Sequence, residues 1–78
     1  MNIEELKSLV EREDKRLTVA DAREYFKGCI PGWKLFSESN GFDWIDVTRH
    51  GLLASQLLTT NDSMATNLVT YVYLRDKR

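Results

Sequence analysis

The helix-breaking residues of this chain are concentrated in its middle third. All four glycines and the only proline lie there: Gly28, Pro31, Gly32, Gly41 and Gly51. Because glycine and proline are the strongest local signals for turns, their placement predicts short helices joined by tight corners between residues 28 and 51. Two segments that contain neither residue flank this region.

Length and composition limit the chain to one small domain. Its 78 residues suffice for a single domain with a modest core. Apolar residues make up 42% of the chain and charged residues 29%, an ordinary balance that argues against disorder. The formal net charge is −1, so no general basic excess indicates a nucleic-acid partner.

The N-terminal segment has the pattern of a capped amphipathic helix over residues 2–10. Asn2 can cap it, and Glu5 lies three residues further on, which approximates a capping box. The next run, residues 11–16, mixes both charges and is typical of a solvated helix end or connector. The sequence therefore divides into a charged N-terminal helix, residues 1–16, and a core, residues 18–78.

We expect four helices in the region from Thr18 to residue 58. The first begins at Thr18, has its inward face on Val19, Ala22, Tyr25, Phe26 and Cys29, and ends at a type II turn on Pro31 and Gly32. The others span residues 33–40, closed by Gly41, then Asp43 to Gly51, then residues 52–58.

The last segment, from Met64 to about Arg75, fits one further helix. Residues 68–74 are also rich in β-branched and aromatic types, which suit a strand. A lone strand would have no partner in an otherwise helical chain, so helix is favoured. The predicted fold class is all-α, a compact orthogonal bundle of five to six short helices.

Neither catalysis nor metal binding is predicted. Cys29 and His50 are the only thiol and imidazole, and Cys29 falls on the apolar face of its helix, where a thiol is inert. His50 follows Asp46 by four residues, which gives half of a metal site without further ligands of the usual kind. We expect no catalytic residue, no metal ligand and no cofactor.

Residues 35–49 are similar to a DNA-binding helix-turn-helix. Small Ser37 stands where the two helices would cross, Gly41 at the turn and Val47 inward on the second helix. In that arrangement four residues would face the major groove: Trp44, Ile45, Thr48 and Arg49.

Two features weaken the DNA-binding interpretation. Asp43 and Asp46 oppose the single Arg49, so the second helix would repel phosphate, and His50 occupies a position that is normally apolar. A helical corner without a DNA-binding role explains the same residues and is favoured. DNA binding is kept as the alternative.

Aromatic residues are the remaining indication of function. They make up 10% of a small chain, so some of them are expected at the surface, where Trp and Tyr are favoured contact anchors. The alternative is that they fill the core. If exposed, they would mark a face for a protein partner or for a homodimer: Trp33, Trp44, Tyr71 and Tyr73.

Three runs resemble small proteins encoded by bacteriophages and prophages: residues 25–33, 40–44 and 50–52. The resemblance spans roughly residues 18–72 and assigns no site residue. It implies a compact accessory protein that acts by protein binding, in virion assembly or in modulating a host protein.

We also expect the protein to work in the cytoplasm of a bacterial host. One cysteine cannot form an intramolecular disulfide, which fits a reducing compartment. The N-terminus lacks the pattern of a signal peptide, and no apolar run is long enough to span a membrane. A membrane partner is therefore not expected.

Overall fold

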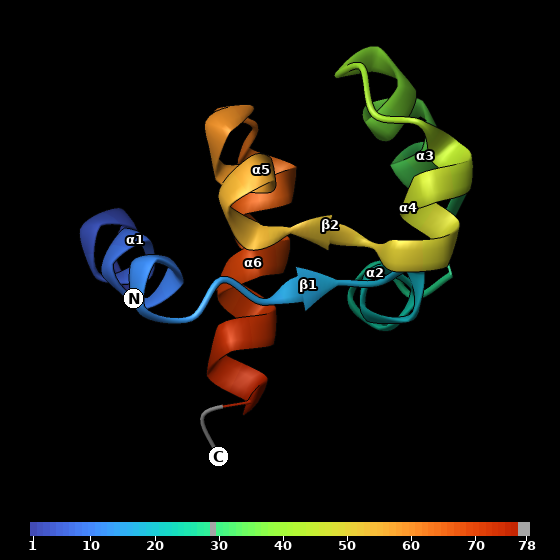
Figure 1. Ribbon diagram of the computed structural model, residues 1–78. Helices are drawn as coiled ribbons and strands as arrows, with labels where there is room; N and C mark the ends of the chain where they lie inside the picture. The colour runs from blue at the N-terminus through green and yellow to red at the C-terminus, as the bar shows by residue number, and fades with distance from the viewer. Residues whose placement is uncertain (29, 77–78) are drawn as a thin grey trace.

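Helices dominate the computed structural model, which describes residues 1–28 and 30–76 (Figure 1). In these residues, six helices and two very short strands follow one another along the chain, so the predicted small, mostly helical bundle is confirmed. The elements are α1 (Ile3–Arg12), β1 (Arg16–Leu17), α2 (Val19–Phe26), α3 (Ile30–Ser39), α4 (Trp44–His50), β2 (Leu52–Leu53), α5 (Ala54–Thr59) and α6 (Ser63–Asp76).

The helices form two groups on either side of the strands. Helices α1, α5 and α6 lie on one side, and α2, α3 and α4 on the other, with β1 and β2 between them (Figure 1). Helix α2 also packs against α6, so the two groups share one core within a molecule of 29 × 23 × 21 Å. Among the described residues, no helix has both the length and the apolar character needed to cross a membrane.

The strand pair was not predicted. β1 runs antiparallel to β2, with Arg16 opposite Leu53 and Leu17 opposite Leu52. Residues 11–16 are therefore more than a solvated helix end or connector, since α1 stops at Arg12 and Arg16 enters the sheet. A two-residue strand is too short to produce the alternating pattern by which strands are recognised.

The predicted helix over residues 52–58 is correct only from Ala54 onward. Leu52 and Leu53 are extended, and the Ala54 amide donates a hydrogen bond to the Lys15 carbonyl oxygen at 2.9 Å. Because this bond joins residues far apart in sequence, local helix propensity gives no sign of it.

The predicted end of the second helix is also wrong. Helix α2 stops at Phe26, where Lys27 and Gly28 adopt positive φ angles of 53° and 90°. Pro31 and Gly32 lie in the first turn of α3 and not in a type II turn. Proline is tolerated there because the first amides of a helix have no intrahelical partner. Cys29, expected on the inward face, lies outside the described residues.

The predicted helix caps are confirmed. The Asn2 side chain accepts a hydrogen bond from the Glu5 amide at 2.8 Å, and Thr18 forms a capping box with Asp21. Residues 68–74 belong to helix α6, as favoured. Local signals of this kind depend on neighbours in sequence and can therefore be read without the tertiary structure.

The core draws on every part of the chain. Leu6 and Val10 of α1 are buried in the same cluster as the residues of α6, so residues 1–16 are not separate from the core. A row of aromatic side chains runs through the group formed by α2, α3 and α4. Trp33 stacks on Phe36 with ring centroids 4.9 Å apart, and the ring centroids of Trp33 and Phe26 are 5.7 Å apart. Trp33 thus joins α2 to α3 from the inside.

Gly51 allows the two groups to meet. Its φ and ψ angles of 73° and −168° fall in a region essentially restricted to glycine. A Cβ atom at this position would lie 2.3 Å from the Leu17 carbonyl oxygen. The backbone just before β2 can approach that of β1 only because residue 51 has no side chain.

We predict that Gly51→Ala lowers the free energy of unfolding by at least about 2 kcal/mol, from backbone strain and from the clash with Leu17. Gly32→Ala is the matched control, because Gly32 is helical and a Cβ there meets nothing within 4 Å. The control should stabilise by about 0.5 kcal/mol. Urea unfolding followed by circular dichroism measures the free energy of unfolding of both variants. Equal changes in the two variants would contradict the close approach of Gly51 to Leu17.

Candidate functional site

The four aromatic residues considered as contact anchors divide into two pairs. Trp33 and Tyr73 have exposed fractions of only 2% and 6%, so the expectation of exposure is wrong for both. Trp33 is held in the aromatic row, and Tyr73 lies under the connector between α1 and β1. Trp44 and Tyr71 are half-buried and pack against the core with part of each side chain at the surface.

A helical corner is formed by α3, residues 40–43 and α4. At the end of α3 the Phe42 amide donates to the Ser37 carbonyl oxygen at 2.9 Å, and the Gly41 amide donates to that of Glu38 at 3.1 Å. These two hydrogen bonds, together with Gly41 at a φ of 80°, form a Schellman motif. The Asp43 side chain then caps α4 by accepting from the Ile45 amide at 3.0 Å.

The inner side of this corner is closely packed. Ser37 is fully buried, and its hydroxyl donates to the Trp33 carbonyl oxygen at 2.8 Å. Val47 is 1% exposed. The inward positions predicted from the helix-turn-helix spacing are thus occupied as expected, and α3 packs directly against α4.

The outer side of the corner exposes large apolar side chains. Leu35 is 67% exposed and Ile45 is 58% exposed, the two highest values among the large hydrophobic residues described. Ile45 and the half-buried Trp44 line a shallow hollow of about 570 Å³, together with Lys34, Glu38, Gly41, Phe42 and Asp43. Leu35 is not among the residues that line this hollow, but it lies three residues before Glu38 and so beside it on the surface of α3.

Charged side chains surround these apolar residues. Lys34, Glu38, Asp46 and Arg49 are all exposed, and Thr48 is exposed with its hydroxyl bonded to the Ile45 carbonyl oxygen. Within residues 1–28 and 30–76, none of these four charges has an ion-pair partner; every ion pair found there involves Lys15 or Arg75.

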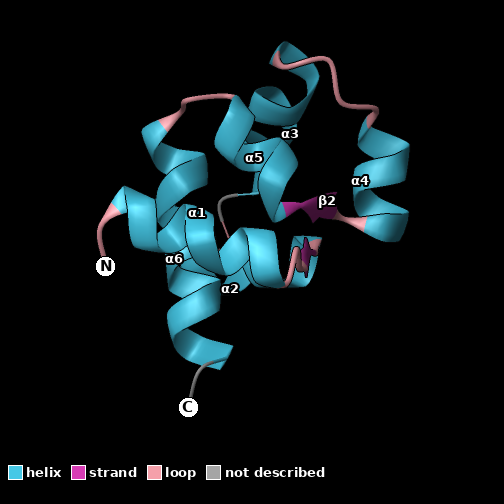
Figure 2. Cartoon of the chain, turned by 60° about the vertical axis from the view of Figure 1, so that its left-hand side comes forward, coloured by secondary structure: helices cyan, strands magenta, loops and turns pink. Residues whose placement is uncertain are grey.

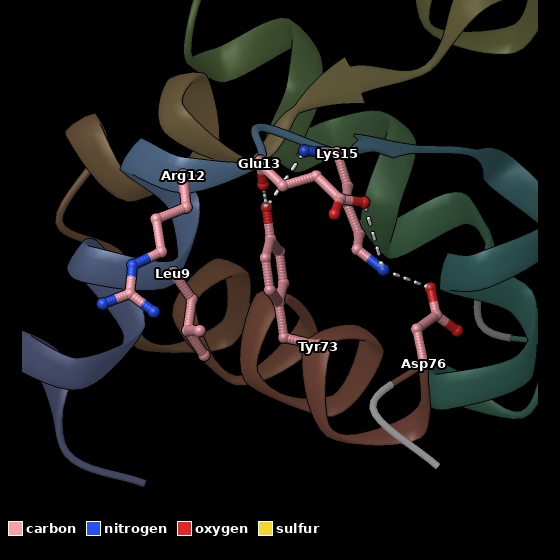
Figure 3. Close-up of a pocket in the computed structure, with 6 residues that line it drawn as sticks. All are labelled: Leu9, Arg12, Glu13, Lys15, Tyr73 and Asp76. Carbon is pink, nitrogen blue, oxygen red and sulfur yellow. Dashed lines mark hydrogen bonds and ion pairs between the residues drawn. The ribbon is translucent and has the colours of Figure 1, made fainter.

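A second cluster lies where α1 approaches the end of α6 (Figure 3). The Tyr73 hydroxyl donates to the Glu13 carbonyl oxygen and accepts from the Lys15 amide at 3.0 Å. Lys15 Nζ lies 3.2 Å from Asp76 and 5.5 Å from the centre of the Tyr73 ring. These residues border a cavity of about 270 Å³ with Leu9 and Arg12.

The ionisable side chains of this second cluster interact with one another. The hydrogen bond from Lys15 to Asp76 raises the pKa of Lys15, and burial raises the pKa of Tyr73. Hydrogen bonds from Arg75 and then Lys15 lower the pKa of Asp76. Each shift favours the protonation state that the folded contacts require, so the cluster ties the connector to α6 and is structural.

Cys29, Asp46 and His50 are the residues considered for catalysis and metal binding. His50 is exposed at the C-terminal end of α4, as is Asp46 one turn earlier. Among the residues described, no three His, Cys, Asp or Glu side chains are grouped so that they could hold a metal ion. Cys29, the other member of the Cys–His pair considered, is outside those residues.

Sequence reasoning identified Trp44 and Ile45 but missed Leu35, Lys34 and Glu38. A signal for Leu35 was present, because it points away from the inward face of α3 formed by Trp33, Phe36 and Ser37. A leucine on the polar side of an amphipathic helix is a candidate contact residue when other apolar side chains lie beside it.

Comparisons with known proteins add no further assignment to this site. No protein-family model, curated protein or solved structure matches the chain. The resemblance to phage proteins stays a prediction, and function has to be inferred from the corner itself.

We predict that Tyr73→Phe lowers the free energy of unfolding by about 1–2 kcal/mol, because it leaves the Glu13 carbonyl and the Lys15 amide without their partner. Tyr71→Phe is the control, because Tyr71 is half-buried and its hydroxyl has no hydrogen-bond partner among the described residues. Its free energy of unfolding should fall by less than about 0.5 kcal/mol. Chemical denaturation of both variants checks this, and a silent Tyr73→Phe would show that the connector is held by other contacts.

Proposed function

We propose that this chain is a non-catalytic module that binds another protein through the outer side of the α3–α4 corner. The observation that carries the proposal is the exposure of Leu35 and Ile45 on two helices that pack against each other, with Ile45 lining the hollow of the corner. The context that the phage resemblance predicts, an accessory protein in assembly or in modulation of a host protein, is compatible with such a module.

The physical argument concerns the free energy that binding would gain. Covering a leucine or isoleucine side chain is worth about 1.5–3 kcal/mol each, provided that the surrounding groups do not lose their hydrogen bonds. The corner meets that condition, because the Schellman motif and the Asp43 cap already satisfy the backbone of the turn. Trp44 adds area at low conformational cost, since its side chain is already held against the core.

DNA binding is the second candidate, and the corner geometry is what favours it. Ile45, Thr48 and Arg49 lie on the outer side of α4, where a recognition helix would present them. The charges oppose it: Asp43 and Asp46 accompany Arg49, and Glu38 lines the adjacent hollow. Phosphate contacts dominate affinity for DNA, so we rank protein binding first.

We predict that Ile45→Asp weakens partner binding at least about tenfold without unfolding the chain. Ile3→Asp is the matched control, because Ile3 is a comparably exposed isoleucine (45%) on α1, outside the residues that line the hollow. A photo-reactive crosslinker at residue 48 of the tagged chain, expressed in cells, would report the partner. We expect covalent adducts with the wild-type chain and with Ile3→Asp, and at least a tenfold loss with Ile45→Asp.

Adducts that persist unchanged in Ile45→Asp would contradict the proposal. Titration with mixed-sequence duplex DNA covers the alternative: salt-sensitive binding that Arg49→Ala weakens would favour DNA over protein. Circular dichroism of each variant confirms that the helices are intact.

A further inference from the structure

We infer that the molecule bound by the α3–α4 corner is a second copy of this chain, in a two-fold symmetric dimer with the two α3 helices antiparallel. The inference rests on the proposed function and names its partner. It comes from the charges of α3, because the exposed face of this ten-residue helix carries Lys34 and Glu38 four residues apart, with the exposed Leu35 beside Glu38.

Such a face is complementary to itself. In an antiparallel pair related by a two-fold axis, the N-terminal half of one helix lies opposite the C-terminal half of the other. With the axis level with residue 36, Lys34 of each copy faces Glu38 of the other, and two identical ion pairs form. Leu35 lies three residues before Glu38 and so beside it on the helix surface, where the same arrangement covers it.

Neither charge is used within the described chain. Lys34 and Glu38 have the i, i+4 spacing that permits an ion pair on one helix, yet no such pair forms, and no other described residue pairs with either of them. The hollow that they line also contains Trp44 and Ile45, and these belong to the same flank of α3. The two-fold axis places this flank of α3 on the same side of the helix pair in both copies. The two α4 helices therefore approach each other on that side.

The expected dimer is weak. Helix α3 is about 15 Å long, and a standard interface of roughly 800 Å² per partner would require about one sixth of the 5061 Å² surface of the chain. The corner supplies less than that, because its apolar part is confined to a few side chains. We therefore expect a micromolar dissociation constant and dimers only at high protein concentration.

Sedimentation velocity over a concentration series tests the inference. The wild-type chain should change from monomer to dimer, and Leu35→Glu should raise the dissociation constant at least about tenfold. Lys34→Glu alone and Glu38→Lys alone should each be monomeric, because each places like charges across the two-fold axis. An equimolar mixture of these two variants should dimerise, since every facing pair is then of opposite charge.

The matched control uses Lys7 and Glu11, an exposed pair with the same spacing on α1. Lys7→Glu and Glu11→Lys should each dimerise like the wild type. A chain that is monomeric at every concentration would overturn the inference, as would a mixture of the two α3 variants that gains nothing over each alone. If the chain is monomeric but crosslinking to another protein still depends on Ile45, the second copy is excluded while the proposed function stands.

Discussion

The fold depends on the close contact between the backbone at Gly51 and that at Leu17. This contact brings β1 and β2, which are distant in sequence, within reach of strand pairing, and a side chain at residue 51 would prevent it. Once the two strands pair, α1, α5 and α6 are placed on one side and α2, α3 and α4 on the other (Figure 1). Figure 2 shows how β2 connects the end of α4 to α5. A glycine that completes a helix end thus also determines how the two halves of the molecule meet.

Polar contacts reinforce this arrangement unevenly. The connector between α1 and β1 is fixed by the Tyr73 hydroxyl and by Asp14, which accepts from the Ser55 amide at 3.0 Å. All ion pairs found among the described residues involve Lys15 or Arg75, near the end of α6. The α3–α4 corner is held by apolar packing and helix caps, so Lys34, Leu35, Glu38 and Ile45 make no side-chain hydrogen bond or ion pair among the described residues. That separation is the physical basis for our proposal that the corner binds a partner.

The corner was the most predictable part of the candidate site. Ser37, Gly41 and Val47 follow from the steric needs of two helices that cross closely, and those needs are visible in residue type and spacing. The roles of Trp33 and Tyr73 were not predictable, because aromatic side chains suit a core and a binding face equally well. Only the packing of α2 and the path of the connector decided that both are buried.

By itself the sequence determined the helical class, the caps at Asn2, Thr18 and Asp43, and the stops at Gly41 and Gly51. All of these depend on hydrogen bonds between near neighbours. The tertiary structure alone decided that residues 16–17 and 52–53 pair as strands and that Pro31 begins a helix. Each of these outcomes depends on contacts between distant segments, whose energies no local pattern contains.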